Sequence, residues 1–474
     1  MVSQDIAFMS AIELAEAVKS KQVSPVELVQ SYLERIDRLD PGLHAYITVC
    51  REEALATARQ AEQDLARGGD LGPMFGVPIA VKDQFWTKGI LTTNGSRIYQ
   101  DFVPDEDATV VAKLKEAGAI ILGKLNLSEL AMGGTKEPYY GTTRNPWDLE
   151  RTPGESSSGC GVAMAAHLSG ASVGEDTGGS GRGPAAYCSV VGLRPTYSRV
   201  SRFGMTYMCW FMDAAAPITK TVADCALVLG VIAGHDQKDP YTSSRSVPDY
   251  TASLGLGVRG LRVGYVRELY EDSGLHPEVK TAFEKALGVL RDLGAHVTEV
   301  SLPLASLAGA IFVCIADTEG AGARDEILRT RANELDGASR TRLQAASLVP
   351  AKVYNRAMKA RVLLRQQMMD LFGDVDVLAS PTSPFPPPKH SDLTASFGNA
   401  EDVRSRFFFR RSYTGCYSLS AMPAISVPCG FTSDNLPVGL QLGARPFGEQ
   451  TLFRTAHAYE QATGWHSMRA PAVE

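Results

Sequence analysis

The fold is decided by the stretch Gly76-Val77-Pro78-Ile79-Ala80-Val81-Lys82 and by the segments after it. Residues 76–81 are an apolar run that predicts a buried strand. Asp107 caps a predicted helix that runs to about Ala117, and Gly118 ends that helix. The apolar run at residues 119–122 predicts a second buried strand. A strand, a turn, a helix and a strand in succession are typical of an α/β fold.

The same alternation continues toward the C-terminus. Further strands are predicted at residues 261–266, 296–300, 375–379, 425–427 and 438–442, and further helices at residues 159–168, 221–233, 278–293, 354–371 and 450–462. Five prolines at residues 381–388 predict an irregular loop. Because strands and helices alternate throughout, the predicted class is α/β with a large sheet, mixed or mostly parallel.

Three regions differ in character. Residues 1–70 are predicted to be N-terminal helices, because Ser10 and Ser24 each precede a glutamate by three positions, the spacing of a capping box. Residues 75–235 hold the strongest motifs and form the predicted catalytic core. Residues 300–410 are the least core-like and are predicted to be a substrate-facing insertion. The sequence shows neither an internal repeat nor a clear linker, so one domain is predicted over all 474 residues.

The composition is that of an ordinary globular protein. Of the 474 residues, 44% are hydrophobic and 21% are charged, which is enough apolar material for a large core. The formal net charge is −6 and no basic block is interleaved with aromatic residues, so no nucleic-acid partner is expected. The chain does not open on a basic segment followed by an apolar stretch, and no run of about 18 apolar residues occurs. Neither a secretory signal nor a membrane partner is therefore expected.

The eight cysteines are scattered and never spaced Cys-x-x-Cys. They are therefore interpreted as reduced thiols of a cytoplasmic protein. The eight histidines are dispersed without a His-x-x-x-His pair, which argues against a protein-bound metal. No cofactor is predicted.

A glycine-rich run, residues 174–182, surrounds Ser180. Its glycines let several backbone N–H groups turn toward one point, as in a nest that stabilises the oxyanion of a tetrahedral intermediate. A plain glycine-rich turn explains the run equally well when it is taken alone. The Gly-x-Ser-x-Gly elbow of lipases does not fit, because Arg182 stands in place of the final glycine.

A serine cluster, Ser156-Ser157-Ser158, lies 24 residues before Ser180. Residues 154–159 have the glycine spacing of a phosphate-binding loop. The next two residues are cysteine and glycine where lysine and serine or threonine are required, so phosphate binding is disfavoured. Three serines before a small-residue helix are compatible with helix capping and with catalysis.

Lys82 follows the first predicted strand. A lysine there is more often a surface charge, and a role as a base requires burial, since desolvation favours a neutral amine. Together with Ser156 and Ser180, however, it fits a lysine base, a bridging serine and a serine nucleophile. This combination predicts hydrolysis of an amide-like bond.

The three pieces together resemble the amidase signature family. The motifs that carry the resemblance are residues 76–83, 143–148, 176–180, 192–196, 199–202 and 423–428. They extend over nearly the whole chain and are highly specific. The resemblance implies a single α/β domain with a long mixed central sheet flanked by helices on both faces.

The resemblance also implies roles for individual residues. Ser180 is the implied nucleophile, Lys82 the base, and Ser156 the bridging serine, joined to Ser157 by a cis peptide bond. The implied oxyanion donors are the backbone N–H groups of Thr177, Gly178, Gly179 and Ser180. Neutral Lys82 would draw a proton from Ser156 while Ser156 takes one from Ser180. Ser180 would then attack the carbonyl, and water would cleave the acyl-enzyme.

The chain departs from the family pattern beside these residues. Glu155 stands where a small residue is usual, and Gly181 replaces an aliphatic residue between Ser180 and Arg182. Neither departure removes a catalytic group. Both positions flank the site, so they could reshape the pocket or change the charge near Lys82.

Within this family, the sequence resembles most that of the glutamine-handling subunit of the tRNA-dependent amidotransferase. Examples are residues 144–151, 234–236 and 436–442. That subunit has an acidic residue for the α-amino group of its substrate, a short distance before the motif at residues 423–428. Here Arg411 is the residue nearest to that position. This difference counts against glutamine as the substrate.

Two apolar stretches bear on the substrate. Residues 207–212 follow the nucleophile region, and residues 407–409 are a second aromatic cluster. Aromatic and methionine side chains suit a broad apolar pocket, although plain core packing is an equally good interpretation. The predicted pocket residues are Met132, Gly133, Tyr207, Trp210 and Phe211.

The sequence therefore predicts a stand-alone serine amidohydrolase for small, neutral, aromatic amides, with anilides, carbamates (urethanes) and hydrazides as related substrates. The first alternative is the glutamine-hydrolysing A subunit of an aminoacyl-tRNA amidotransferase. The second is a catalytically silent scaffold, and the intact Lys82, Ser156 and Ser180 argue against it. The expected partner is a small molecule. The family is often dimeric, and the sequence leaves a homodimer open.

Overall fold

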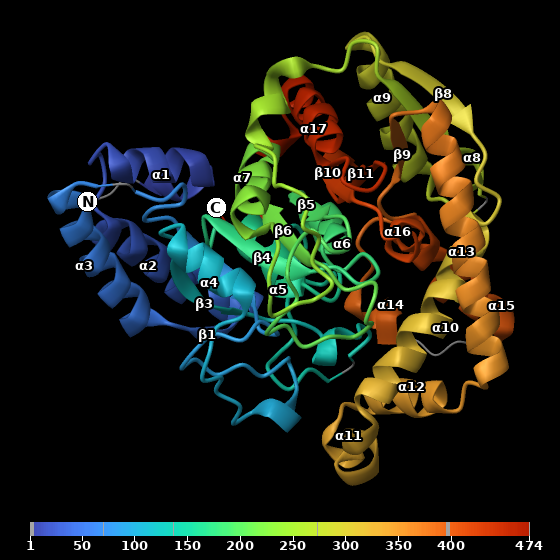
Figure 1. The fold of residues 1–474 in the computed structure, drawn as a ribbon, viewed down its shortest axis with the longest axis horizontal. Helices are drawn as coiled ribbons and strands as arrows, with labels where there is room; N and C mark the ends of the chain where they lie inside the picture. The colour runs from blue at the N-terminus through green and yellow to red at the C-terminus, as the bar shows by residue number, and fades with distance from the viewer. Residues whose placement is uncertain (1–3, 70, 136, 273, 395–398, 474) are drawn as a thin grey trace.

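A mixed sheet of eleven strands runs through the computed structural model, which describes residues 4–69, 71–135, 137–272, 274–394 and 399–473 (Figure 1). The strands are β1 (Tyr46–Val49), β2 (Pro78–Lys82), β3 (Ile120–Leu125), β4 (Ala171–Glu175), β5 (Val191–Arg194), β6 (Ala215–Thr219), β7 (Arg262–Val266), β8 (His296–Val300), β9 (Val377–Pro381), β10 (Ala424–Phe431) and β11 (Pro437–Gly443). Their order across the sheet is β1-β3-β2-β4-β6-β5-β10-β11-β9-β7-β8. The predicted α/β class with a long mixed sheet is confirmed.

Parallel and antiparallel pairs alternate in blocks along the sheet. β3, β2 and β4 are parallel, as are β9, β7 and β8, whereas β4 to β9 are linked through antiparallel pairs of β6, β5, β10 and β11. Every residue of β2, β3, β4, β5 and β6 is buried, while the edge strand β8 is largely exposed. Strands buried along their whole length require cover on both faces of a sheet.

Helices supply that cover. They are α1 (Ala11–Lys19), α2 (Pro25–Leu43), α3 (Arg51–Arg67), α4 (Thr109–Glu116), α5 (Ser158–Ala165), α6 (Arg182–Cys188), α7 (Val222–Ile232), α8 (Arg267–Tyr270), α9 (Pro277–Asp292), α10 (Ala305–Ala323), α11 (Asp325–Thr330), α12 (Gly337–Ser347), α13 (Ala351–Asp374), α14 (His390–Thr394), α15 (Ala400–Asp402), α16 (Phe409–Leu419) and α17 (Glu449–Thr463). Short 3-10 turns lie at Gln4–Phe8, Arg97–Tyr99, Glu129–Ala131, Thr251–Leu256, Ala332–Glu334, Trp465–Ser467 and Pro471–Val473, and a π-helical turn lies at Val403–Phe408. α5 packs on β2, β3, β4 and β6, α6 on β5, β10 and β11, and α9 on β8 to β11.

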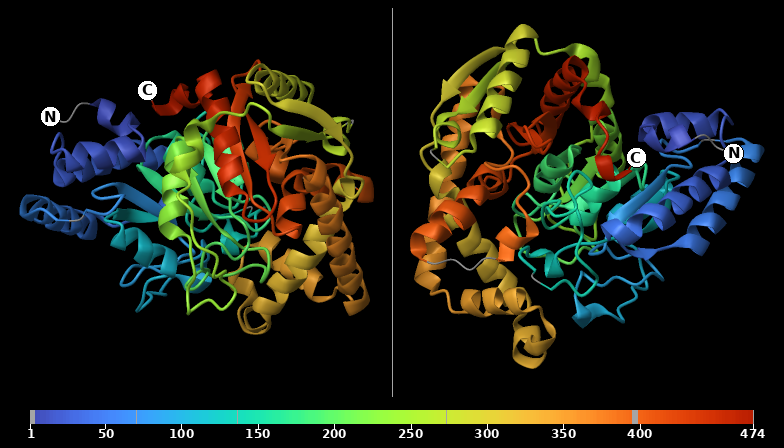
Figure 2. Two further views of the ribbon diagram at one scale, coloured as in Figure 1. Left: turned by 45° about the horizontal axis from the view of Figure 1, so that its top comes forward. Right: turned by 180° about the vertical axis from the view of Figure 1, so that it is seen from behind.

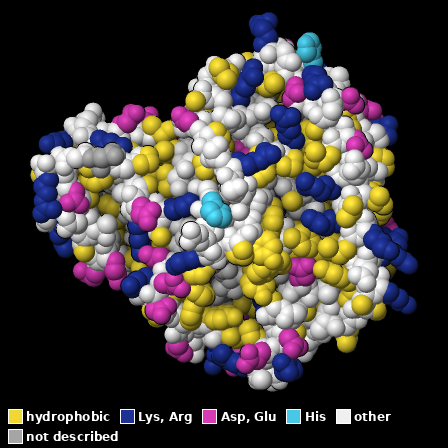
Figure 3. All heavy atoms as spheres, in the orientation of Figure 1, with side chains coloured by type: hydrophobic (Ala, Val, Ile, Leu, Met, Phe, Trp, Pro, Cys, Tyr) yellow, Lys and Arg dark blue, Asp and Glu magenta, His cyan; other side chains and the backbone are white. Residues whose placement is uncertain are grey.

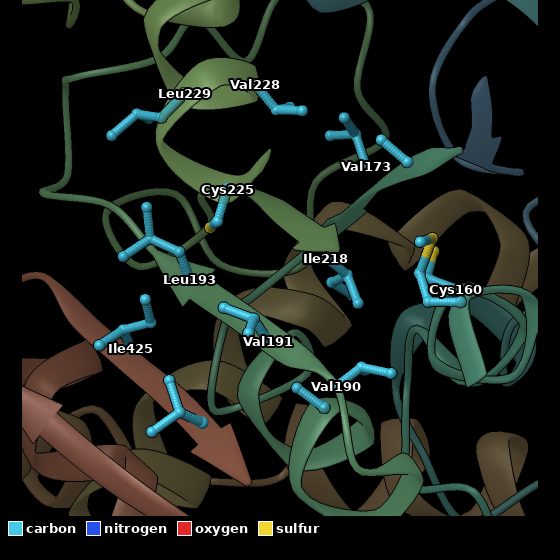
Figure 4. Close-up of a cluster of buried hydrophobic side chains, with 14 of the residues drawn as sticks. Cys160, Val173, Val190, Val191, Leu193, Ile218, Cys225, Val228, Leu229 and Ile425 are labelled. Atoms are coloured by element: carbon cyan, nitrogen blue, oxygen red, sulfur yellow. The ribbon is translucent and has the colours of Figure 1, made fainter. Parts of the chain in front are cut away.

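The core around the central strands is made of branched aliphatic side chains. Figure 4 shows Val173 of β4, Leu193 of β5, Ile218 of β6 and Ile425 of β10 in one cluster with Cys225 of α7. All five are buried. Tight packing of this kind holds the strand ends in place, and the loops that follow those ends carry the residues described below.

Two groups of helices lie on opposite sides of the molecule. α1, α2 and α3 form one group, and α10 to α13 form another on the far side of the molecule, with α11 projecting from it (Figures 1 and 2). On the face in Figure 3, acidic and basic side chains are interspersed. α10 has the length and composition of a membrane-spanning helix, but 56% of its apolar window is buried inside the protein. A core helix passes the same test, so this is weak evidence of a membrane segment.

Most predicted elements are confirmed, with shifts of a few residues at their ends. The capping boxes at Ser10 and Ser24 both form. The predicted cap of α4 is wrong, because Ala108 precedes that helix and the Asp107 carboxylate instead accepts from the Lys88 N–H and pairs with Lys115. The sequence does not predict the strands β1, β4, β5 and β6 or the helices α6, α8, α10, α11, α12, α14, α15 and α16. Small residues dominate several of these segments and give weak periodic patterns.

Candidate active site

Lys82 ends β2 in the middle of the sheet and is fully buried. Its Nζ lies 2.7 Å from Ser156 Oγ and 3.1 Å from Glu175 Oε2 at the end of β4. Lys82 is thus held between a serine hydroxyl and a carboxylate, with no exposed surface.

The serine cluster opens α5. The Ser157 N–H donates to the Ser180 carbonyl at 3.3 Å, and its hydroxyl donates to the Glu175 carbonyl at 3.0 Å. These contacts join the start of α5 to both β4 and the loop of Ser180. The predicted cis bond between Ser156 and Ser157 is wrong, since the cis peptide bond joins Glu155 to Ser156. Ser157 instead caps α5, where its carbonyl accepts from the Gly161 N–H.

The loop of Ser180 is built around a buried carboxylate. Asp176 accepts from the Arg182 guanidinium at 2.9 Å through both of its oxygens, and Arg194 Nη1 lies 3.5 Å away. All three side chains are fully buried. Although burial raises the pKa of Asp176, the two guanidiniums outweigh it and hold that pKa well below its ordinary range. The loop is therefore anchored by a charged network rather than by apolar packing.

Two glycines of this loop are required by close contacts. A Cβ on Gly178 would collide with the Phe312 ring, and a Cβ on Gly179 would collide with the Thr414 side chain. Gly179 also has φ +113°, a conformation that side chains disfavour. The Thr414 hydroxyl donates to the Gly178 carbonyl at 2.6 Å. α16 is thereby fastened directly to the loop.

The predicted oxyanion donors differ in their availability. The Gly179 N–H donates to Asp176 Oδ1 at 2.8 Å, so this amide is engaged inside the protein. The N–H groups of Thr177, Gly178 and Ser180 make no hydrogen bond to a described residue. The prediction that all four amides face one point is therefore wrong for Gly179. The hydrogen bond from this amide to Asp176 fixes the conformation of the loop.

A second acidic group lies behind the loop, and no sequence motif marks it. The Thr177 hydroxyl contacts both Glu175 and Asp213, and its oxygen lies 2.7 Å from Asp213 Oδ1. Burial, followed by the nearby Glu175 charge, raises the pKa of Asp213 to about 7. Lys82, Glu175, Thr177 and Asp213 thus form one buried polar chain. Only the spatial proximity of β4 and residue 213 reveals it.

A cavity of about 90 Å³ opens above Ser156 and Ser180. It is lined by Ala131, Met132, Gly133, Gly154, Glu155, Ser156, Thr177, Gly178, Gly179, Ser180, Gly183, Tyr187, Met208, Phe312, Ala316, Arg342, Thr382, Ser383, Arg410, Arg411 and Thr414. The cavity thus contains the predicted pocket residues Met132 and Gly133. Ser180 is half-buried at its floor, and its hydroxyl makes no hydrogen bond to a described residue. A small substrate could therefore approach this hydroxyl.

The other three predicted pocket residues lie outside the described lining of this cavity. Tyr207 and Trp210 are 41% and 45% exposed and stack edge to face with each other, and the Arg202 guanidinium sits over the Trp210 ring. Phe211 packs under the Arg361 guanidinium at 4.1 Å. The prediction that Tyr207, Trp210 and Phe211 line the pocket is therefore wrong for this cavity. Met208 alone of that stretch turns inward, because a tight turn around Asp213 points its neighbours elsewhere.

Three arginines line part of the cavity. Arg342 comes from α12, and Arg410 and Arg411 come from the first turn of α16. Arg342 pairs with Asp317 of α10, whereas neither Arg410 nor Arg411 has an ion pair with a described acidic residue. Burial and the charges of Arg410 and Arg342 lower the pKa of Arg411 well below its ordinary value.

The described residues include no cluster suited to a metal ion. Within this part of the chain, no three histidine, cysteine, aspartate or glutamate side chains are grouped so that they could hold one. All eight cysteines are free thiols, and seven of them are buried.

Comparison with known proteins places the chain beside amide-handling enzymes. A family model described as Amidase matches residues 27–453. The A subunit of glutamyl-tRNA(Gln) amidotransferase from Geobacter metallireducens is 42% identical, over 97% of this chain and 98% of that protein. The crystal structure of the same-named subunit from Thermotoga maritima has a TM-score of 0.82 at 34% identity and covers 100% of both chains. A chain from a vestigial protein complex, described as revealing the evolutionary origins of an s-triazine catabolic enzyme, has a TM-score of 0.89 at 32% identity, covering 96% of this chain and 99% of its own.

These relatives overturn the predicted set of partners. The sequence led us to expect a small molecule, no nucleic acid, and at most a second copy of the chain. The relatives from Geobacter metallireducens and Thermotoga maritima are each named as one subunit of an enzyme whose name includes a tRNA. Net charge could not reveal this, because one chain of an assembly can meet nucleic acid through the other chains and need not carry a basic surface of its own.

Proposed function

Since the chain belongs to the amidase family, we propose that it is a serine amidohydrolase that cleaves the C–N bond of a small amide through an acyl-enzyme on Ser180. The observation that carries the proposal is the buried contact of 2.7 Å between Lys82 Nζ and Ser156 Oγ, at the floor of the cavity that holds Ser180. Their contact suits proton transfer.

The proposed reaction uses these residues in sequence. Neutral Lys82 takes the proton of the Ser156 hydroxyl, and Ser156 takes that of the Ser180 hydroxyl. Ser180 Oγ bonds to the carbonyl carbon, and the carbonyl electron pair moves to its oxygen. When that pair returns, the C–N bond breaks and the leaving nitrogen takes the relayed proton. Water then attacks the ester and restores Ser180.

The oxyanion formed in this step needs donors above Ser180. The N–H groups of Thr177, Gly178 and Ser180 are proposed for this role, and that of Gly179 is left out because Asp176 already accepts from it. Phe312, Ala316 and Arg342 come from the region 300–410 and line the same cavity. They support the proposal that this region faces the substrate.

The test compares the purified chain with its Ser180→Ala variant on nitroanilide, benzamide, aryl carbamate, hydrazide and glutamine. Release of amine by the wild type alone, with an acyl adduct on the Ser180 peptide in mass spectrometry, is the expected result. Equal rates for the two proteins, or an adduct on another residue, would contradict the proposal. The panel also ranks the leaving groups.

A second candidate function is favoured by the 42% identity with the A subunit of a glutamyl-tRNA(Gln) amidotransferase. In this case the chain hydrolyses glutamine within an assembly that passes ammonia to an aminoacyl-tRNA. The test measures glutamine hydrolysis by the chain alone and after co-expression with the remaining subunits of a relative's amidotransferase. A rate that rises only in the complex, together with amidated tRNA, supports this function. A rate unchanged by the other subunits excludes it.

We also propose a cytoplasmic location. All eight cysteines are free thiols, and free thiols are typical of a reducing compartment. Fractionation of cells that express the native chain tests this proposal.

A further inference from the structure

The described cavity above Ser180 carries a concentration of positive charge. Three arginines, Arg342, Arg410 and Arg411, line a space of about 90 Å³, and Glu155 is the one carboxylate among the lining residues. Guanidiniums at the wall of a small cavity are costly to desolvate unless an anion pairs with them. The charge that the cavity offers to a ligand therefore depends on which of the three already have such a partner.

Arg342 is satisfied within the protein. Asp317 of α10 accepts from its guanidinium through both oxygens, at 2.7 Å to Nε and 2.5 Å to Nη2. A bidentate pair of this kind neutralises the charge and fixes the side chain. Arg342 therefore shapes the cavity and leaves little charge for a ligand.

Arg410 and Arg411 are not satisfied in this way. Arg411 donates to the Phe407 carbonyl at 3.0 Å and lies 3.8 Å from the Phe407 ring centroid, but neither contact supplies a negative charge. Glu155, the only carboxylate among the described lining residues, accepts from the Gly134 N–H at 2.7 Å and makes no ion pair with either arginine. Burial and the neighbouring guanidiniums lower the pKa of Arg411 well below its ordinary value, which is the electrostatic sign of an unmet charge.

The helix that carries the two arginines aims them at the reacting loop. Thr414 lies three residues after Arg411 and four after Arg410, so all three share one face of α16. Thr414 contacts the oxyanion loop, because its hydroxyl donates to the Gly178 carbonyl at 2.6 Å and its own carbonyl accepts from Arg182 at 3.1 Å. The two arginines thus lie about one helical turn before the residue that contacts the oxyanion loop, and both line the cavity that holds Ser180.

We propose that the substrate is an amide whose acyl part carries a carboxylate and no ammonium group, and that Arg410 and Arg411 bind this carboxylate. The inference rests on the proposed amidohydrolase function and names its substrate class. A planar carboxylate matches the fork of a guanidinium. An ammonium group in the same place would face two positive charges, with Glu155 alone to oppose them. Dicarboxylic acid monoamides fit this description, and free glutamine does not.

The test uses substrates that differ in one group. Pentanamide, the monoamide of glutaric acid, and glutamine share the same amide and chain length, and they end in a methyl group, a carboxylate, and a carboxylate beside an ammonium. The monoamides of malonic and succinic acid extend the series to shorter spacers, each with its own neutral match. A charged hydrogen bond contributes about 1.5–3 kcal/mol, so a well-spaced monoamide should exceed its neutral match about ten- to hundred-fold in kcat/KM. Glutamine should fall below the glutaric monoamide.

Variants locate the effect. Arg411→Gln should remove most of the carboxylate preference, mainly through KM, and Arg411→Lys should restore part of it. The control is Arg340→Gln, the same charge change two positions before Arg342 on α12 and outside the described cavity lining. It should leave the preference unchanged. Thermal unfolding of each variant excludes misfolding as the cause.

Binding measurements separate this inference from the proposed function. Ser180→Ala should bind glutarate or succinate in calorimetry, and adding Arg411→Gln should abolish that binding. A Ser180-dependent burst with 4-nitrophenyl acetate tests the acyl-enzyme without any carboxylate. If that burst occurs but monoamides show no advantage and dicarboxylates do not bind, the inference is wrong and the function stands. If dicarboxylates bind but no substrate reacts at Ser180, the function is wrong and the carboxylate site stands.

Discussion

Two sets of arginines surround the Ser180 loop, and they differ in their partners. Arg182 and Arg194 are fully buried and share the carboxylate of Asp176. Arg410 and Arg411 line the cavity with no ion pair to a described acidic residue. The first set holds the backbone of the loop, whereas the positive charges of the second set have no ion pair with a described carboxylate. A paired arginine is part of the scaffold, and an unpaired one at a cavity indicates what the cavity binds.

The largest expected effect comes from the floor of the site. Lys82→Ala should lower kcat/KM by about a thousand-fold or more, because the proposed base is lost. It should also lower the free energy of unfolding by about 3 kcal/mol, since the buried Glu175 carboxylate loses the hydrogen bond from Nζ. Steady-state assays and urea unfolding measure the two losses.

Lys124→Ala is the matched control for this variant. Lys124 is equally buried on the neighbouring strand β3 and pairs with Asp83 at 3.0 Å, but it does not contact Ser156. Its removal should cost comparable stability and much less specific activity. Equal losses of specific activity for the two lysines would show that Lys82 acts only through the fold.

Asp176→Asn should have the next largest effect. The change leaves Arg182 and Arg194 buried without a counter-charge, so unfolding should become easier by about 3–5 kcal/mol. Chemical denaturation at neutral pH measures the change. A loss below about 1 kcal/mol, the usual worth of an exposed ion pair, would remove the distinction between the two arginine sets.

Gly179→Ala should cost about 1–3 kcal/mol, because φ is +113° and the new Cβ would meet Thr414. Activity should fall as well, since Thr414 holds the loop through the Gly178 carbonyl. Thermal melts and initial rates test both statements. Gly288→Ala in α9, where a Cβ meets nothing, should be neutral or stabilising by up to about 1 kcal/mol.

The buried acid behind the loop gives a dependence of stability on pH. The pKa of Asp213 is raised by burial and by Glu175, from 3.8 to about 7. A raised carboxyl pKa contributes stability that is present below the unfolded value and is lost as pH rises through the folded value. The melting temperature should therefore fall between pH 5 and pH 8 by more in the wild type than in Asp213→Asn. Parallel curves for the two proteins would contradict this account.

The smallest expected effect is on the stability of the cavity wall. Arg410→Gln removes a charge that has no ion pair with a described residue, so unfolding should change by about 0.5 kcal/mol or less. Set beside Asp176→Asn, it measures how differently the two arginine sets contribute. A loss of several kcal/mol would mean that Arg410 has a structural role that the described contacts do not include.

The sequence predicted the parts of the fold and site that depend on short, local patterns. The alternation around residues 76–122 indicates the α/β class, and the capping boxes at Ser10 and Ser24 mark helix starts that the structure confirms. Lys82 ends a short apolar run, and Ser156 and Ser180 stand in glycine- and serine-rich motifs. Such patterns can be recognised in a sequence because helix ends and strands require particular residue types at fixed spacings.

The sequence by itself determined the fold class, the family, and the residues that meet at the floor of the cavity. Only the tertiary structure shows which side chains line the rest of the cavity. Arg342, Arg410 and Arg411 line the same cavity as Ser180 from positions more than 160 residues away along the chain, and the sequence singles out only Arg411, by its place before residues 423–428. Only the packing of α10, α12 and α16 shows that Asp317 pairs with Arg342, while Arg410 and Arg411 pair with no described acidic residue. Whether a charged side chain has an ion-pair partner depends on how near in space two segments lie that are far apart in the sequence. No local pattern of residues encodes that distance.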